Sequence, residues 1–156
     1  MRFAQPYRNE FDVITLRPMT LGDYDAVIAL MQQTPGVSIR DADSREAVGR
    51  YLLRNPDLSF VALSGDDFIG CIMSGHDGKR GYLQHLVVLP AYRRQGIASS
   101  LVQRCTEALR AHGIEKFHVD VLKTNGPAAD YWVAQGWKLR TDIDRYSFIP
   151  SGNANA

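Results

Sequence analysis

The feature that most constrains the fold is a basic, glycine-containing turn between an apolar run and an amphipathic segment. Residues 86–90 are apolar and end at a proline, and the turn Arg93-Arg94-Gln95-Gly96-Ile97-Ala98 follows. Apolar side chains then recur about every 3.6 residues, which predicts a helix. These positions are Ile97, Leu101, Val102, Cys105 and Leu109. Because strand, turn and helix come in order, the first N–H groups of the helix and the positive end of its dipole face one point. The turn therefore predicts an anion site, with a pyrophosphate as the natural ligand.

The rest of the chain alternates between short strand-like segments and segments with helical periodicity. A strand at 13–17 precedes two helices, which begin near the capping residues Thr20 and Ser44. Three strands at 58–63, 68–74 and 81–88 come before the helix at 97–111. A strand at 117–121, a helix opened by Asn125 and closing strands at 137–139 and 144–149 follow. The order β-α-α-β-β-β-α-β-α-β-β predicts a mixed α/β (α+β) fold, with helices on both faces of a mostly antiparallel sheet.

Composition limits the function classes. The 156 residues predict one domain over 1–150 and a disordered tail over 151–156. A net charge of +1 gives no general attraction to nucleic acid or to an anionic membrane, so neither is an expected partner. No apolar run approaches about 18 residues, and residues 1–10 do not have the apolar core of a secretory signal. Cys71 and Cys105 lie in apolar segments and are expected to be buried thiols, a disulfide being the alternative. We therefore expect a cytoplasmic protein.

Two motifs carry a family resemblance. The first is Arg93-x-x-Gly96-x-Ala98, and the second is Asn125-x-x-Ala128 followed by Gly136-Trp137. Together with the order of elements, they resemble the GNAT superfamily of acyl-CoA-dependent N-acetyltransferases over residues 13–149, and small bacterial members above all. The resemblance implies acetyl-CoA as the cofactor, a primary amine as the acceptor, and direct transfer in a ternary complex. It also allows a homodimer.

The resemblance assigns cofactor contacts to three places. The amides of residues 95–99 would bind the CoA pyrophosphate, with charge added by Arg93 and Arg94. The strand that ends at Val88 would separate from its parallel neighbour, and the Val88 amide would hold the thioester oxygen as negative charge develops on it. The residues assigned to the cofactor are Leu86, Val87, Val88, Arg93, Arg94, Gln95, Gly96, Ile97, Ala98, Ser99, Asn125 and Trp132.

The candidate general base is His85. An amine with a pKa near about 10.4 is mostly protonated at neutral pH, so a group must accept its proton. Many members of the superfamily carry acidic residues just before the Leu-x-Val of this strand, where this chain has Gln84 and His85. Glutamine cannot accept a proton usefully, whereas an imidazole can. The alternative is a histidine hydrogen-bonded within the sheet. Strand alternation places Tyr82 on the opposite face from His85 and makes it a weaker candidate.

The general acid is where the chain departs from the family pattern. Seven residues after Asn125, where the family often has a tyrosine that protonates the leaving thiolate, stands Trp132. An indole N–H donates hydrogen bonds but is not a useful acid. Tyr131 is the neighbouring candidate, although one helical step turns a side chain by about 100°. The alternative is that no side chain serves, because a thiol with a pKa of about 8.5 leaves readily as a thiolate.

The acceptor is expected to lie against the first two helices, their connecting loop and the end of the chain. Four acids fall in these loops, namely Asp41, Asp43, Asp142 and Asp144. They favour a small cationic amine, although solvated loop acids and a peptide amine remain alternatives. No metal is predicted, because His118 and Asp120 do not have the spacing of zinc ligands. A non-catalytic acyl-CoA-binding or regulatory module is the alternative function.

Overall fold

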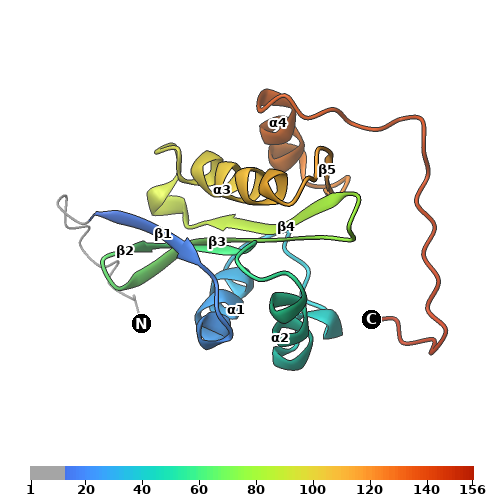
Figure 1. The fold of residues 1–156 in the computed structure, drawn as a ribbon, viewed down its shortest axis with the longest axis horizontal. Coiled ribbons are helices and arrows are strands. Elements are labelled where there is room, and N and C mark those ends of the chain that lie inside the picture. Colours follow the sequence, from blue (N-terminus) through green and yellow to red (C-terminus); the bar gives the residue numbers. More distant parts are fainter. Residues whose placement is uncertain (1–12) are drawn as a thin grey trace.

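The sheet is built in chain order. The computed structural model describes residues 13–156, and these contain five strands arranged β1-β2-β3-β4-β5 (Figure 1). The strands are β1 (Ile14–Pro18), β2 (Phe60–Ser64), β3 (Asp67–His76), β4 (Gly81–Val88) and β5 (Phe117–Val119). The first four pair antiparallel, and β5 alone is parallel to its neighbour β4. The sheet is therefore mixed and mostly antiparallel, as predicted.

Helices cover both faces of the sheet. On one face lie α1 (Tyr24–Gln32) and α2 (Arg45–Arg54), and on the other α3 (Ile97–Ala111) and α4 (Gly126–Ala134) (Figure 1). Single 3₁₀ turns, η1 (Leu21–Asp23), η2 (Asp41–Asp43) and η3 (Pro90–Tyr92), precede α1, α2 and α3. Ser44 Oγ accepts the Ala47 N–H and Asn125 Oδ1 accepts the Ala128 N–H, so these two predicted caps are confirmed. The third, Thr20, precedes η1, and α1 itself begins after Asp23.

Each face has its own apolar core. Beneath α3, residues such as Leu101, Cys105 and Leu109 are fully buried against the sheet. On the α1 face, Val27 and Met31 pack with Val61, Cys71 and Val87. Both cysteines are free thiols, and burial raises the pKa of each to about 12. They act as small apolar side chains, as predicted.

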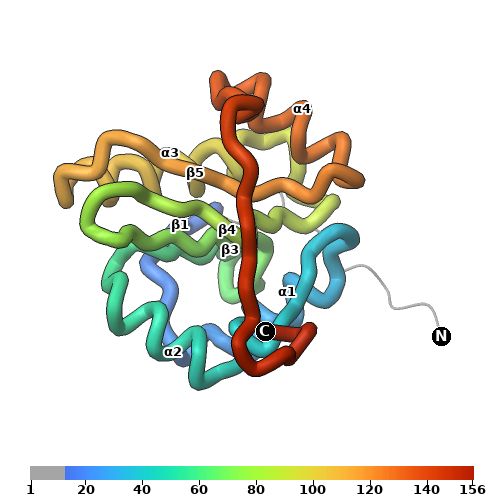
Figure 2. Tube along the Cα trace, turned by 90° about the vertical axis from the view of Figure 1, so that its right-hand side faces the viewer, coloured from blue at the N-terminus to red at the C-terminus, as the bar shows by residue number. Residues whose placement is uncertain are grey.

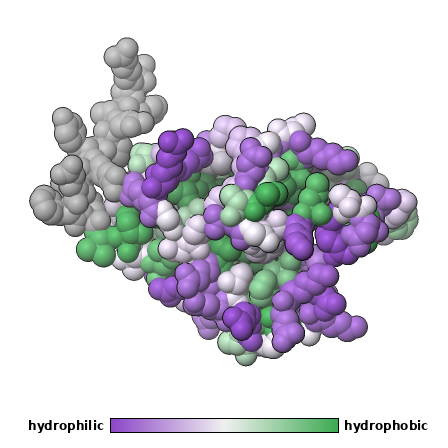
Figure 3. Space-filling view, turned by 90° about the horizontal axis from the view of Figure 1, so that it is seen from above, coloured by the Kyte–Doolittle hydropathy of each residue, from purple (hydrophilic) through white to green (hydrophobic). Residues whose placement is uncertain are grey.

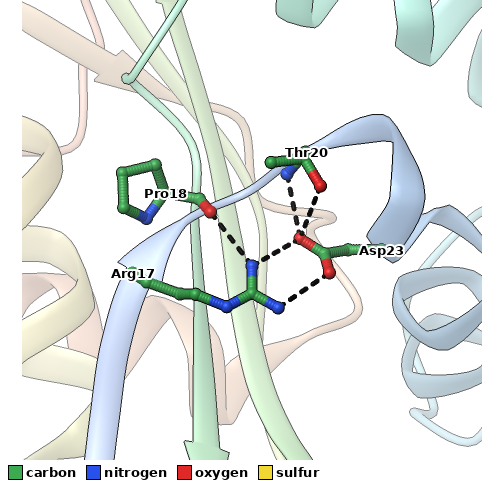
Figure 4. A network of polar contacts seen from close by, with 4 residues as sticks. All are labelled: Arg17, Pro18, Thr20 and Asp23. Carbon is green, nitrogen blue, oxygen red and sulfur yellow. Dashed lines mark hydrogen bonds and ion pairs between the residues drawn. The ribbon is translucent and has the colours of Figure 1, made fainter.

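A partly buried ion pair fixes the end of β1. The two terminal nitrogens of Arg17 donate to the two carboxylate oxygens of Asp23 at 2.8 and 2.9 Å, and the Thr20 N–H donates to the same carboxylate at 2.9 Å (Figure 4). The hydrogen bonds from Arg17 outweigh the effect of burial and lower the pKa of Asp23. The carboxylate therefore joins the strand end to the start of the first helical segment.

The order of elements matches the prediction from β1 to α4, but the two closing strands do not form. The predicted strands at 137–139 and 144–149 lie in one extended stretch of the chain. Within the described part of the chain, residues 138–148 make no backbone–backbone hydrogen bond. A strand needs a paired neighbour, and this stretch passes across the ends of the sheet strands instead of along β5 (Figure 2). Residues 151–156, predicted to be disordered, lie against η2, where Asn153 and Asn155 donate to Asp41.

Candidate active site

A cleft opens where β4 and β5 separate. The two strands pair only from Gly81 to Leu83 and from Phe117 to Val119. Beyond these pairs lie two adjoining cavities, of about 660 and 430 Å³. They share the lining residues Val37, Leu86, Asn125, Ala128 and Trp132. We call the larger cavity the turn end of the cleft and the smaller one the histidine end.

The turn end is lined by the predicted basic turn. Gly96 has a φ of +77° and precedes α3, whose first backbone hydrogen bond runs from the Ser100 N–H to the Gly96 carbonyl. No side chain caps this helix, so the amides of residues 97–99 have no acceptor within it. A Cβ placed on Gly96 would meet nothing within 4 Å, so the site needs glycine for its backbone conformation and not for space. Uncapped amides beside an open cavity and two arginines fit a pyrophosphate.

The end of β4 faces the cleft with its main chain. The Leu89 N–H donates to the Ile69 carbonyl of β3 at 2.8 Å, and successive residues of a strand point their N–H groups to opposite sides. The Val88 N–H therefore points away from β3, toward the separation of β4 and β5. On the same side, Arg93 Nε donates to the Val88 carbonyl at 3.0 Å and holds the basic turn against the strand end.

A β-bulge shapes the histidine end. Cys71 pairs with Val87 and Met73 with Gln84, so two residues of β4, His85 and Leu86, lie opposite one residue of β3. His85 takes a φ of +53°, which is rare for a residue with a side chain. The extra residue breaks the strand alternation, and His85, Gln84 and Tyr82 all line this end of the cleft. The predicted placement of Tyr82 on the opposite face from His85 is therefore wrong.

His85 is paired with a buried aspartate. Its Nε2 lies 2.8 Å from Oδ1 of Asp43, and the side chains are 16% and 10% exposed. Asp43 Oδ2 also accepts the Arg40 N–H at 2.9 Å, and the Tyr24 hydroxyl donates to the Asp43 carbonyl. Burial alone raises the pKa of Asp43, but the hydrogen bonds from His85 and Arg40 outweigh it, so the pKa is lowered.

This pairing fixes the tautomer of His85. An ionised carboxylate can only accept, so in the neutral ring Nε2 of His85 carries the hydrogen and Nδ1 carries the lone pair. Within residues 13–156, Nδ1 makes no hydrogen bond. The histidine end therefore contains an imidazole whose other nitrogen is held by a carboxylate, an arrangement that suits a general base.

Tyr131 and Trp132 take different positions on the wall of the cleft. The Tyr131 hydroxyl lies 3.3 Å from Ser99 Oγ, and its ring contacts Trp132 edge to face. Tyr131 lines the turn end, whereas the buried Trp132 lines both ends and packs on Trp137. The Asn125 amide nitrogen lies 3.1 Å from the position that a Cβ on Gly36 would take, so the loop before η2 lies over the start of α4.

Most residues predicted for the cofactor meet at this cleft. Every residue assigned to the cofactor lines one of the two cavities, except Gln95 of the basic turn. Of the four loop acids, Asp43 reaches the site, whereas Asp41 binds Asn153 and Asn155, and Asp142 pairs with Arg140. The sequence did not predict the contact of Asp43 with His85. The one local sign of an ordered position is that Asp43 directly precedes the helix cap Ser44.

Other candidate chemistry does not assemble. Asp120 pairs with Arg145 at 2.9 Å, and the ring of His118 stacks on Tyr82 with centroids 5.7 Å apart. Burial and nearby cations lower the pKa of His118. In the described part of the chain, no three His, Cys, Asp or Glu side chains are grouped to hold a metal, and no helix is long and apolar enough to cross a membrane.

Seen from above Figure 1, the α3 and α4 side of the molecule exposes apolar side chains among polar ones (Figure 3). Comparison with known proteins gives the cleft a context. A model described as the acetyltransferase (GNAT) family matches residues 24–137. An acetyltransferase of Pectobacterium atrosepticum is 35% identical over 103 residues, covering 66% of this chain and 72% of that protein.

Two solved structures share the fold. The aminoglycoside N-acetyltransferase AAC(6')-Iy in complex with CoA has a TM-score of 0.70 at 20% identity, covering 90% of this chain and 97% of its own. The PaiA N-acetyltransferase of Thermoplasma acidophilum in complex with coenzyme A has a TM-score of 0.73 at 19% identity, covering 85% and 93%. The family model covers well over half of the chain and includes the turn, β4 and α4. The chain therefore belongs to the GNAT family of acetyltransferases.

Proposed function

We propose that the protein is an N-acetyltransferase that moves the acetyl group of acetyl-CoA to a primary amine by direct attack, with His85 as the general base. The observation that carries this proposal is the 2.8 Å contact between His85 Nε2 and Asp43 at the end of the cleft opposite the anion-binding turn. One cleft thus offers a cofactor site at one end and a proton acceptor at the other.

The turn end binds the cofactor. The amides of residues 97–99 and the side chain of Arg94 bind the pyrophosphate, and the wall formed by Ala128 and Trp132 packs along the pantetheine. When bound, acetyl-CoA supplies a thioester carbonyl carbon that bonds to the amine nitrogen, while its sulfur leaves as a thiolate. The Val88 N–H donates to the carbonyl oxygen as negative charge develops there.

The histidine end handles the proton. An ammonium group must lose a proton before its nitrogen can attack, and Nδ1 of His85 accepts that proton, directly or through a water. Asp43 then stabilises the imidazolium through Nε2–H and keeps the ring in one orientation. The cavity of about 430 Å³ suits a small molecule or the end of a peptide. The aminoglycoside acetyltransferase among the structural neighbours favours a small-molecule amine.

Tyr131 is assigned to the cofactor wall and not to proton transfer. Its hydroxyl faces Ser99 at the turn end, while His85 lies at the other end. A thiolate with a parent pKa of about 8.5 can leave without a side-chain acid and take its proton from water.

The test is a panel of amine acceptors with detection of released thiol. Acetyl-CoA is expected to raise the melting temperature of the wild type. His85→Gln is expected to lower kcat by about 10²- to 10⁴-fold while keeping that thermal shift. His112→Gln, at the exposed end of α3, is the matched control and should leave kcat unchanged. Undiminished turnover in His85→Gln would remove His85 from the mechanism, and a missing thermal shift would refute the cofactor assignment.

A second candidate is a non-catalytic acyl-CoA-binding module. It is favoured by Trp132 at the position where related enzymes often have a tyrosine, and by the contact of Tyr131 with Ser99. It predicts that acetyl-CoA binds but that no amine of the panel releases thiol. Thiol release with any acceptor, abolished in His85→Gln, would exclude it.

A further inference from the structure

The 3₁₀ turn η2 carries two aspartates that bind different parts of the molecule. Asp43, its last residue, is 10% exposed and lies 2.8 Å from Nε2 of His85. Asp41, its first residue, is exposed and accepts hydrogen bonds from residues 153 and 155. Only one residue, Ala42, separates the two aspartates. A turn of three residues has no flexible length that could absorb a displacement, so a shift of Asp41 also shifts Asp43.

The last residues of the chain bind Asp41 at every polar position. We call residues 151–156 the tail, which reaches η2 at the end of the extended stretch (Figures 1 and 2). Asn153 and Asn155 donate from Nδ2 to the two carboxylate oxygens of Asp41, both at 2.7 Å, and the Asp41 N–H donates to the Asn155 carbonyl at 2.9 Å. Asn153 Oδ1 accepts the Asn155 N–H at 3.1 Å, which fixes the orientation of the Asn153 amide. The two donors also lower the pKa of Asp41.

The contacts of the tail continue inward to Asp43. Arg40, the residue before η2, donates from Nη1 to the Ala154 carbonyl at 3.5 Å and from its N–H to Asp43 Oδ2 at 2.9 Å. The Asp43 N–H donates to the Arg40 carbonyl at 2.9 Å. A continuous path of hydrogen bonds therefore runs from the tail through residues 40 and 41 to Asp43, and from there to His85.

The chain before η2 does little to fix the turn. Within residues 13–156, residues 38 and 39 make no backbone–backbone hydrogen bond. On the other side of η2, Ser44 caps α2, and the Tyr24 hydroxyl donates to the Asp43 carbonyl at 2.7 Å. These contacts hold the last residue of the turn, whereas the tail holds the first. Loss of the tail contacts would therefore leave η2 held mainly at one end.

We propose that Asn153 and Asn155 are positioning residues for His85. They hold η2 in the place where Asp43 orients the imidazole, although neither asparagine is assigned a contact with a substrate. The effect on turnover rests on the proposed function of His85, whereas the effect on the imidazole itself does not. The two can therefore be measured separately.

Asn155→Asp tests this role with a change that keeps the size of the side chain. The new carboxylate would face Oδ1 of Asp41, so repulsion between like charges replaces a hydrogen bond. In the wild type, NMR should detect a slowly exchanging His85 Nε2–H that is protected by Asp43. In the variant this proton should exchange at least about 10-fold faster, because local opening becomes easier. Turnover should fall roughly 10-fold with an unchanged KM for acetyl-CoA, since a small displacement of a reacting group is costly.

A second variant exchanges donor and acceptor. In Asp41→Asn/Asn155→Asp, the amide at position 41 can donate to the carboxylate at position 155 and still accept from Asn153. Both the exchange rate and kcat should return to within about twofold of the wild type. Ala156→Asp is the matched control, because it adds the same charge beside Asn155 without replacing a donor, and it should change neither measurement. Circular dichroism verifies the fold of each variant.

The outcomes separate this proposal from the proposed function. An unchanged exchange rate in Asn155→Asp, a wild-type Nε2–H that exchanges too fast to detect, or no recovery in the double variant would overturn the positioning role. Absence of turnover with every amine would refute the proposed function, and the NMR comparison would still decide the positioning role. If Asn155→Asp does not fold, Asn155→Ala removes the donor without adding a charge and takes its place in the same measurement.

Discussion

Replacing Asp43 with asparagine tests the link between the fold and the proton chemistry. The carboxylate accepts from His85 at 2.8 Å and from the Arg40 N–H at 2.9 Å, and it is 10% exposed. Asparagine has the same size but only one acceptor oxygen, so one of the two donors must face its NH₂ group. A buried donor left unpaired costs about 1–3 kcal/mol of unfolding free energy. For a chain of this length, that lowers Tm by roughly 2–12 °C.

The same change removes the charge that stabilises the imidazolium of His85. A hydrogen bond to a charged group contributes about 1.5–3 kcal/mol, so kcat should fall roughly 10- to 150-fold. The KM for acetyl-CoA should not change, because the turn end of the cleft is untouched. Asp43→Glu keeps the charge at the cost of one extra methylene and should recover part of kcat.

Steady-state kinetics and urea unfolding measure these effects, with Asp25→Asn as the control. Asp25 is 94% exposed on α1, and its replacement should change the unfolding free energy by less than about 0.5 kcal/mol. Because the pKa of Asp43 is lowered below its ordinary 3.8, its contribution to stability is present above pH 3.8 and is lost as the pH falls through the folded-state value. The gap between the wild type and Asp43→Asn should therefore narrow below pH 3.8. A folded Asp43→Asn with wild-type kcat, or one that loses acetyl-CoA affinity instead of kcat, would refute the positioning role.

Three further outcomes follow from other contacts. Asp23→Asn should lower the unfolding free energy by about 1–2 kcal/mol at pH 7, a modest loss because Arg17 is partly exposed. Because the pKa of Asp23 is lowered, urea unfolding should show this loss shrinking as the pH falls below 3.8. Gly70→Ala should lower Tm in a thermal scan, because its Cβ would lie 2.8 Å from the Val87 carbonyl oxygen. Tyr131→Phe should keep kcat within about twofold in the thiol assay, and a 100-fold loss would restore Tyr131 as the acid.

The half of the site that we propose for the cofactor could be located from the sequence because its elements are neighbours along the chain. The end of β4, the turn and the start of α3 are contiguous in the sequence. Gly96 adopts a φ of +77°, and glycine is the residue type that such a positive φ favours. The cap at Asn125 is also local, since its partner is the Ala128 N–H. Periodicity and capping rules act over three or four residues, and these elements need nothing more.

The half that we propose for proton transfer could not be predicted in the same way. Asp43 and His85 are 42 residues apart, and their contact depends on how η2 packs against the sheet. The predicted alternation of side chains along β4 is also wrong at His85, because a β-bulge adds a residue there and the apolar pattern does not indicate it. A histidine with a φ of +53° leaves no local sign that could be read in advance.

The closing strands show why an apolar pattern alone does not make a strand. Tyr146 and Phe148 alternate with polar residues, as apolar residues do in a half-buried strand. Such a strand is stable only when its apolar side chains are buried and its backbone is paired. The alternation does not indicate which strand edge, if any, supplies the backbone pairing. In the structure the chain's own β5 is not that edge, because the contacts of Asp120 and Asp41 direct the stretch after α4 across the strand ends. The prediction of closing strands is therefore wrong for a physical reason: within residues 13–156 no strand edge lies beside this stretch to accept and donate its backbone hydrogen bonds.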